Sequence, residues 1–127
     1  MHSKKLKDIS NTSLTRVSSF LSELYTSDVA RFSLSDVVKG AEVSRLEAYS
    51  VIEHLIEENI IKPQIEVRCP QCDQREGRYN RKSDVPNQSE SEFCGHSFDT
   101  KSEDNWDIVY KFEGELESDF FRSLVIV

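Results

Sequence analysis

Three cysteines restrict the structures open to this chain more than any other feature of its sequence. Two residues separate Cys69 from Cys72, and Cys94 follows after 21 more residues. An odd number of cysteines argues against a disulfide framework, whereas two thiolates on one tight turn suit a metal ion. The sequence therefore predicts a metal site, with ordinary buried thiols as the alternative.

A fourth ligand can come from the histidine that lies just after the last cysteine. Pro70 would stiffen the first turn, and neighbouring backbone N–H groups would stabilise the charge on sulfur. The predicted ligands are Cys69, Cys72, Cys94 and His96. Four protein ligands leave a zinc ion no open position, so it would stabilise the fold and would not activate water. We therefore expect one structural Zn²⁺.

The first part of the chain is predicted to contain two helices. Residues 1–11 are polar and rich in lysine, which is typical of a loose arm. Apolar residues between positions 14 and 25 then recur at helical spacing and predict a helix of about three turns. Ser35 and Asp36 can cap a short second helix, which Gly40 would end in a left-handed conformation.

A third helix is predicted between Ser44 and Asn59. Ser44 and Glu47 form the S-x-x-E pattern of a capping box, and a run of apolar residues at helical spacing follows. Two helices joined by a short turn, the second one longer, describe a helix-turn-helix. Residues 64–68 alternate polar and apolar side chains and predict a strand after the third helix.

This order of elements resembles winged helix-turn-helix regulators. The resemblance is carried by the close of the third helix, Ile52…Leu55-Ile56-Glu57-Glu58-Asn59-Ile60-Ile61-Lys62. The cysteine pattern is similar to a zinc ribbon, and the order of the two domains resembles the alpha subunit of the general transcription factor TFIIE and its archaeal counterpart. These resemblances imply an α+β fold, in which a winged helix of three helices and a wing strand precedes a zinc-ribbon-like β unit.

The expected domain boundaries follow from these patterns. The winged helix would occupy residues 1–67 and the zinc-ribbon-like unit residues 68–112. Residues 106–112 are predicted to form a strand that either completes the sheet of the second unit or pairs with the strand at residues 65–67. Residues 113–127 form an acidic and then apolar tail that ends in LVIV. Because such an end would be an aggregation hazard if exposed, we expect it to pack on its own core or on another subunit, as in a homodimer or a complex.

The charge of the chain is unevenly distributed. It carries 16 Lys and Arg against 23 Asp and Glu, for a formal charge of -7. This excess argues against a protein that coats nucleic acid or an anionic membrane. Residues 62–82 differ, because they hold six basic and three acidic groups and include Tyr79. Such a segment suits a phosphate backbone with one stacked base, or it is a solvated insertion. Its candidate contact residues are Arg75, Arg78, Arg81 and Lys82.

The first turn of the third helix is the other candidate contact with nucleic acid, and we expect DNA rather than RNA. Its candidate residues are Ser44, Arg45, Tyr49 and Ser50, with Lys39 reaching a phosphate. Arg45 is the best base reader, because its guanidinium matches the two acceptors of guanine. Four glutamates of the same helix oppose this interpretation, since they would repel the phosphates that flank a groove.

The sequence thus favours a small nucleic-acid-binding regulator. The alternative is a protein adaptor or accessory subunit of a larger assembly, for example in transcription or bacterial defence. No phosphate-binding loop, paired carboxylates or nucleophile with a base can be found, so we do not expect an enzyme. The sequence has no signal peptide and no apolar stretch of membrane-spanning length, which predicts a cytoplasmic or nucleoid-associated protein without membrane contact.

Overall fold

The computed structural model of the protein describes residues 9–116 and 120–123, which form a mixed arrangement of helices and strands. The α+β class expected from the sequence is therefore confirmed. Residues 1–8 of the predicted loose arm and residues 124–127 at the apolar end of the tail lie outside the described residues. The prediction of a loose arm is wrong for residues 9–11, because Ile9 is buried in the core and a helix begins at Asn11. None of the described helices is both long and apolar enough to cross a membrane.

The chain divides into two compact units. The helical unit comprises residues 1–62 and 110–127, and the cysteine unit comprises residues 63–109. The boundaries fall inside strands β2 (Ile61–Arg68) and β6 (Trp106–Phe112), so each strand contributes residues to both units. The sequence predicts boundaries at the ends of these strands instead, because a strand pattern does not reveal where its contacts change from one core to another.

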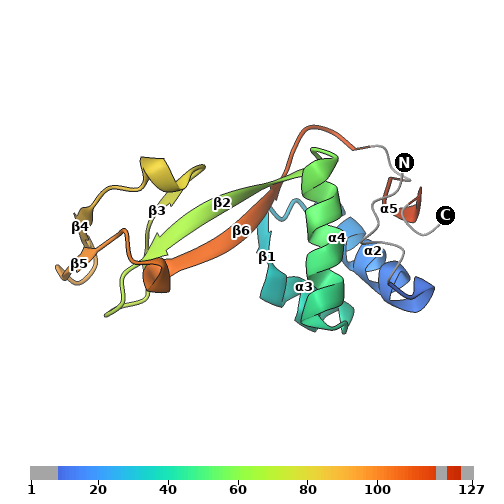
Figure 1. Cartoon of the computed structure of the whole chain (residues 1–127), viewed down its shortest axis with the longest axis horizontal. Coiled ribbons are helices and arrows are strands. Elements are labelled where there is room, and N and C mark those ends of the chain that lie inside the picture. The colour runs from blue at the N-terminus through green and yellow to red at the C-terminus, as the bar shows by residue number, and fades with distance from the viewer. Residues whose placement is uncertain (1–8, 117–119, 124–127) are drawn as a thin grey trace. The chain divides into compact units, whose positions relative to one another are not determined.

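The helical unit begins with α2 (Asn11–Thr26) and β1 (Arg31–Ser33). Two further helices follow, α3 (Leu34–Ala41) and α4 (Arg45–Glu57), and the last described segment is α5 (Phe120–Ser123) (Figure 1). The three predicted helices are thus confirmed. The short strand β1 has no apolar alternation that the sequence could reveal, since it spans only three residues.

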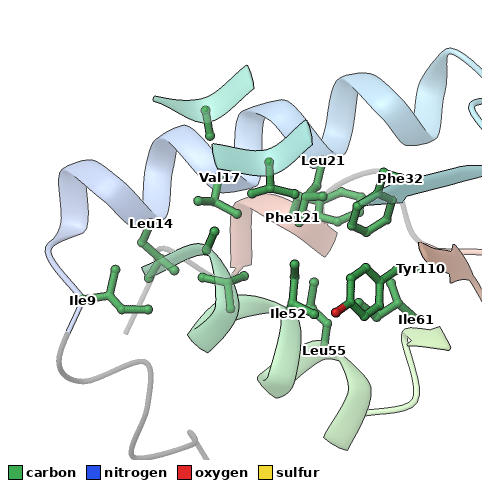
Figure 2. Close-up of a cluster of buried hydrophobic side chains, with 14 residues drawn as sticks. Ile9, Leu14, Val17, Leu21, Phe32, Ile52, Leu55, Ile61, Tyr110 and Phe121 are labelled. Carbon is green, nitrogen blue, oxygen red and sulfur yellow. The ribbon is translucent and has the colours of Figure 1, made fainter. Parts of the chain in front are cut away.

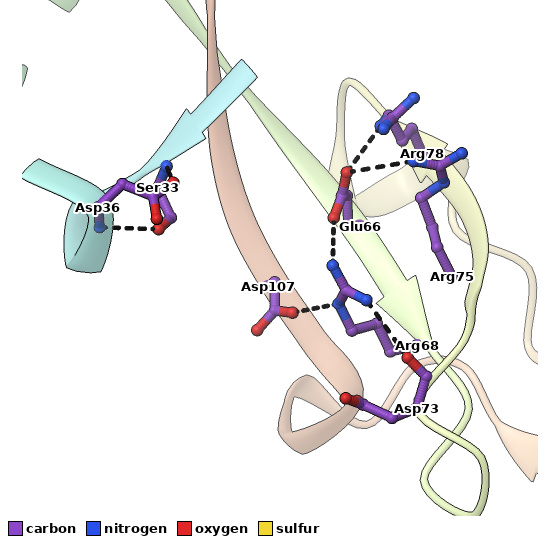
Figure 3. Close-up of polar contacts among 8 residues, drawn as sticks. All are labelled: Ser33, Asp36, Glu66, Arg68, Asp73, Arg75, Arg78 and Asp107. Carbon is purple, nitrogen blue, oxygen red and sulfur yellow. Dashed lines mark hydrogen bonds and ion pairs between the residues drawn. The ribbon is translucent and has the colours of Figure 1, made fainter. Parts of the chain in front are cut away.

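Both α3 and α4 begin with a capping box, in which a serine and an acidic residue satisfy each other's backbone N–H groups. In α4 these residues are Ser44 and Glu47, as predicted. In α3 the hydroxyl of Ser33 accepts the N–H of Asp36, and the Asp36 carboxylate accepts the N–H of Ser33 at 2.9 Å (Figure 3). The prediction that Ser35 caps this helix is wrong, because the helix begins before it.

Gly40 has a different role from the predicted one. Helix α3 runs through Gly40 to Ala41, and Glu42 follows in the left-handed conformation with φ of 56°. Gly40 therefore does not end the helix. A side chain at this position would collide with the ring of Phe20, so glycine allows α2 and α3 to pack closely.

The core of the helical unit draws on most of its elements (Figure 2). Its buried residues from helices α2 and α4 include Leu14, Val17, Leu21, Val51, Ile52 and Leu55. Phe32 of β1 is fully buried, with its ring centroid 5.7 Å from that of Tyr110 and 5.3 Å from that of Phe112. Phe121 is also buried in this cluster, so the start of α5 packs on the core of its own chain.

The strands form two sheets. The larger has the order β1-β6-β2-β3, and the smaller pairs β4 (Gln88–Glu90) with β5 (Ser97–Asp99). Two 3₁₀ turns, Lys82–Asp84 and Glu103–Asn105, connect elements of the cysteine unit.

Strand β3 (Arg75–Tyr79) lies in the basic segment, for which the sequence suggests a solvated insertion as one of two interpretations and predicts no strand. It runs antiparallel to β2, with Glu66 opposite Arg78 and Ile65 opposite Tyr79. The strand has almost no apolar residues to reveal it. Its position is determined by the partner strand and by the charges that the two strands present to each other.

Candidate metal centre

The first cysteine turn, residues 69–74, follows directly after β2. The Asp73 N–H donates to the carbonyl of Cys69 at 2.8 Å, and the Cys69 N–H donates to the carbonyl of Gln74 at 3.0 Å. Asp73 adopts a left-handed conformation with φ of 60°, which tightens the turn. This backbone arrangement directs the side chains of Cys69 and Cys72 to one point.

The third cysteine completes a cluster of thiols. The sulfur atoms of Cys69, Cys72 and Cys94 all lie within 4.8 Å of one another, and those of Cys69 and Cys94 are 3.6 Å apart. Cys69 is buried, Cys72 half-buried and Cys94 exposed. Three thiols at such short separations could bind a metal ion, as the sequence predicts.

The thiols also influence each other's ionisation. Burial by itself would raise the pKa of Cys69, but N–H groups of Cys72 and Gln71 and the neighbouring thiols lower that pKa below its usual value. For Cys94, hydrogen bonds from the Ser91 side chain and the His96 backbone act in the same direction. Burial and the other two sulfurs outweigh them, so the pKa of Cys94 is raised. Three thiolates this close together would repel one another. A cation bound between them would offset that repulsion and favour the deprotonated form of all three thiols.

His96 does not join the cluster, although the sequence predicts it as the fourth ligand. The group of ligand atoms within 4.8 Å of one another contains the three cysteines alone among the described residues. The His96 ring instead lies parallel to that of Phe98, with the centroids 6.3 Å apart.

Comparisons with protein-family models, with curated proteins and with solved structures found no match to this chain.

A buried carboxylate in β2, that of Glu66, contacts three arginines (Figure 3). The Glu66 side chain is only 5% exposed, and its Oε2 accepts from Nε of Arg78 at 2.7 Å. Its Oε1 accepts from Nη2 of Arg68 at 3.0 Å, while Nη1 of Arg75 lies 3.8 Å from Oε2. A carboxylate this deeply buried needs such partners, because an unpaired buried charge is strongly unfavourable.

Arg68 extends this network to β6 and to the first cysteine turn. Its Nε donates to the carboxylate of Asp107, and its Nη1 donates to the carbonyl of Asp73 at 3.3 Å. Partial burial would lower the pKa of Arg68, but the hydrogen bond and charge of Asp107 and the charge of Glu66 raise it above the usual value. Arg68 therefore stays charged and links β2, β6 and the turn.

The four basic residues of the segment 62–82 that are predicted to contact phosphate all have acidic neighbours. Arg75 and Arg78 face Glu66, as described above. Arg81 Nε lies 3.3 Å from the Asp84 carboxylate, and Lys82 Nζ lies 3.7 Å from that of Glu103. The two latter pairs are exposed and contribute little, whereas the Glu66 pairs hold a buried charge.

The residues of the helical unit that are predicted to contact nucleic acid differ in whether their polar groups are available. Lys39 and Arg45 are exposed. The Ser44 hydroxyl accepts the N–H of Glu47 as part of the cap, and the Ser50 hydroxyl donates to the carbonyl of Leu46 at 2.9 Å. Both hydroxyls are therefore already used inside the helix.

Two apolar side chains on α4 are exposed. Leu46 is 76% exposed and Tyr49 is 46% exposed. The sequence analysis considered Tyr49 but missed Leu46. The available signal was that Leu46 lies outside the apolar stripe formed by Ala48, Val51, Ile52 and Leu55.

Proposed function

We propose that this chain is a metal-stabilised winged-helix module that binds a protein partner as a non-enzymatic adaptor or accessory subunit. The winged-helix assignment is supported by the element order helix, strand, helix, helix, strand, and by the sheet order β1-β6-β2. In a winged helix, the connection between the last two strands is the wing. Here residues 69–105 form that connection, between β2 and β6.

The metal in this proposal is structural Zn²⁺ bound by Cys69, Cys72 and Cys94. The cluster of five buried residues in the cysteine unit supports this role, because so small a core does not stabilise a β unit without a further constraint. A soft thiolate set also suits zinc better than calcium or magnesium. Bound there, zinc would cross-link the two cysteine turns without taking part in a reaction.

The observation that carries the choice of a protein partner is the buried Glu66 with its arginines. Arg75 and Arg78 make the middle of the chain basic in sequence, but both compensate Glu66 in the fold. A phosphate that recruited them would leave a carboxylate with a 5% exposed side chain short of positive charge. The basic segment is therefore better explained as part of the folded unit than as a surface for nucleic acid.

The first two turns of α4 are the proposed contact face. Leu46 and Tyr49 expose apolar surface there, and Arg45 precedes them. Tyrosine and arginine are enriched among the residues that dominate protein interfaces, and exposed apolar side chains gain free energy when a partner covers them. Because glutamates surround this face in the sequence of α4, the expected partner surface has an apolar centre and a basic rim.

Affinity purification of the tagged full-length protein from its own cells tests this proposal. Leu46→Glu should abolish recovery of a specific partner while the helical circular dichroism stays unchanged. Val29→Glu is the matched control, since Val29 is also an exposed apolar residue, at 36%. Recovery of the same partner at the same yield with Leu46→Glu would contradict the proposed face.

DNA binding is the second candidate, and one observation favours it. Among the described residues, no carboxylate lies within ion-pair distance of Lys39 or Arg45. With Ser44 and Tyr49, they would contact a duplex through the first turn of α4. If DNA is bound at low salt, Arg45→Ala should weaken one sequence selectively by about 1–3 kcal/mol, and Arg78→Ala should have no effect. Such a result would replace the protein partner with DNA.

A further inference from the structure

The second cysteine turn, residues 91–96, repeats the backbone hydrogen bonds of the first. In each turn the N–H of the fifth residue donates to the carbonyl of the first, at 2.8 Å in both cases. The N–H of the first residue donates to the carbonyl of the sixth, at 3.0 Å in residues 69–74 and 2.9 Å in residues 91–96. The fifth residue has a positive φ in both, 60° at Asp73 and 75° at Gly95. The two turns are therefore the same structural unit.

This equivalence pairs the side chains of the two turns position by position. Cys72 and Cys94 are the fourth residues and both belong to the thiol cluster. Cys69 is the first residue of its turn, and the first residue of the other turn is Ser91. His96 is the sixth residue of its turn, where it matches Gln74, and it lies outside the thiol cluster. The position that should supply the fourth ligand thus belongs to Ser91.

The surroundings of the Ser91 hydroxyl match those of the Cys69 sulfur. The N–H groups of the third and fourth residues, Gln71 and Cys72, favour the thiolate of Cys69 and lower its pKa. The same two positions in the second turn, Phe93 and Cys94, donate to Oγ of Ser91 at 3.2 and 3.3 Å. Paired N–H donors of this kind stabilise electron-rich ligand atoms. Ser91 is moreover buried, at 3% exposure.

Two opposite edges of the four-atom ligand set fit a tetrahedral ion, and the three sulfurs all lie within 4.8 Å of one another. Oγ of Ser91 lies 3.4 Å from Sγ of Cys72, and the sulfurs of Cys69 and Cys94 are 3.6 Å apart. Typical zinc bond lengths to sulfur and oxygen give tetrahedral edges of about 3.8 Å between two sulfurs and about 3.6 Å between sulfur and oxygen. The observed separations agree with these edges to within a few tenths of an ångström.

We propose that the hydroxyl oxygen of Ser91 is the fourth metal ligand, beside the thiolates of Cys69, Cys72 and Cys94. This assignment rests on the metal centre of the proposed function and replaces His96. An oxygen is a harder ligand than a thiolate, so the centre holds soft ions less tightly than four thiolates would. Replacing Ser91 by cysteine should therefore complete a four-thiolate site and tighten it.

Loading the full-length protein with Co²⁺ tests the assignment, because the sulfur-to-cobalt absorption grows with the number of bound thiolates. Ser91→Cys should raise this absorption by about a third, from three thiolates to four. Its zinc affinity, measured by competition with a chelator, should rise at least about tenfold. Ser83→Cys is the matched control, since Ser83 is exposed, and should change neither quantity. His96→Ala should leave both at the wild-type values.

Ser91→Ala keeps the test decisive if the cysteine variant does not fold. Loss of the hydroxyl should lower the zinc affinity about tenfold, whereas His96→Ala should not. An unchanged affinity in Ser91→Ala, or a loss of affinity confined to His96→Ala, would overturn the Ser91 assignment and leave the three-cysteine centre intact. Failure of the wild-type protein to take up Co²⁺ would instead overturn the metal centre itself, and the Ser91 assignment with it.

Discussion

The two units of this chain are stabilised by different means. Among the described residues, the helical unit buries 14 apolar or aromatic residues in one cluster, whereas the cluster of the cysteine unit has five, one of which is a cysteine. The cysteine unit instead contains a buried carboxylate with three arginines and a cluster of thiols. The difference indicates that hydrophobic burial can stabilise the first unit. The second unit has charge pairing and three cysteines that could hold a metal ion, and the proposed function adds a metal cross-link there.

Removal of the metal should have the largest effect and should separate the two units. Structural zinc contributes about 10–16 kcal/mol of apparent binding free energy, which exceeds the stability of a small domain. A chelator, or Cys72→Ser, should therefore abolish the amide protection of residues 63–109 and preserve that of the helices. Hydrogen exchange followed by mass spectrometry measures both, and restoring zinc to the chelated protein is the control. Unchanged protection of residues 63–109 in the metal-free protein would show that the cysteine unit does not need a metal for its stability.

Leu55→Ala should destabilise the helical unit by about 3 kcal/mol, because Leu55 is fully buried and its truncation leaves a cavity. The free energy of unfolding can be followed in urea by helical circular dichroism. Leu46→Ala on the same helix is the control and should change it by less than about 0.5 kcal/mol, since Leu46 is largely exposed. Equal effects of the two variants would argue against a core centred on α4.

Glu66→Gln should destabilise the zinc-loaded cysteine unit by about 2 kcal/mol. Loss of one partner of a fully buried ion pair costs more, but the arginines around Glu66 are 29–46% exposed and water screens them in part. The free energy of opening of residues 63–109, from hydrogen exchange, measures the effect. Glu103→Gln, which breaks an exposed pair with Lys82, should change it little. If Glu66→Gln left this free energy unchanged, charge pairing would not be one of the means by which the cysteine unit is stabilised.

The smallest effects concern the helix caps. Ser33→Ala and Ser44→Ala should each destabilise the helical unit by about 1 kcal/mol, because each removes a capping hydroxyl. Ser35→Ala should be nearly neutral, since Ser35 is exposed and follows the start of α3. Thermal unfolding ranks the stabilities of the three variants. A larger loss of stability in Ser35→Ala than in Ser33→Ala would indicate that Ser35, and not Ser33, caps α3.

Features with local causes were predictable from the sequence. The capping box at Ser44, the strand at residues 106–112 and the grouping of three cysteines all depend on short spacings that the chain displays directly. The cap of α3 was predicted two residues late, because Ser33 and Ser35 are both plausible caps. Only the pairing of Ser33 with Asp36 distinguishes them.

Features with distant partners could not be predicted in the same way. Strand β3 has little hydrophobic alternation and depends on Glu66, which is nine residues or more away in the sequence. Ser91 was missed because serine is not a common zinc ligand. Its spacing from Cys94 nevertheless equals that of Cys69 from Cys72, and this was the signal that could have revealed it.

The interleaved order of the two units also determines how the protein is assembled during synthesis. Tyr110 and Phe121 are part of the helical core, yet the ribosome produces them only after all of residues 63–109. Part of the apolar surface of the nascent helices therefore stays uncovered while the cysteine turns emerge, and these turns could already bind the proposed metal ion. Metal supply during translation would then affect how long that surface stays open to chaperones or to aggregation.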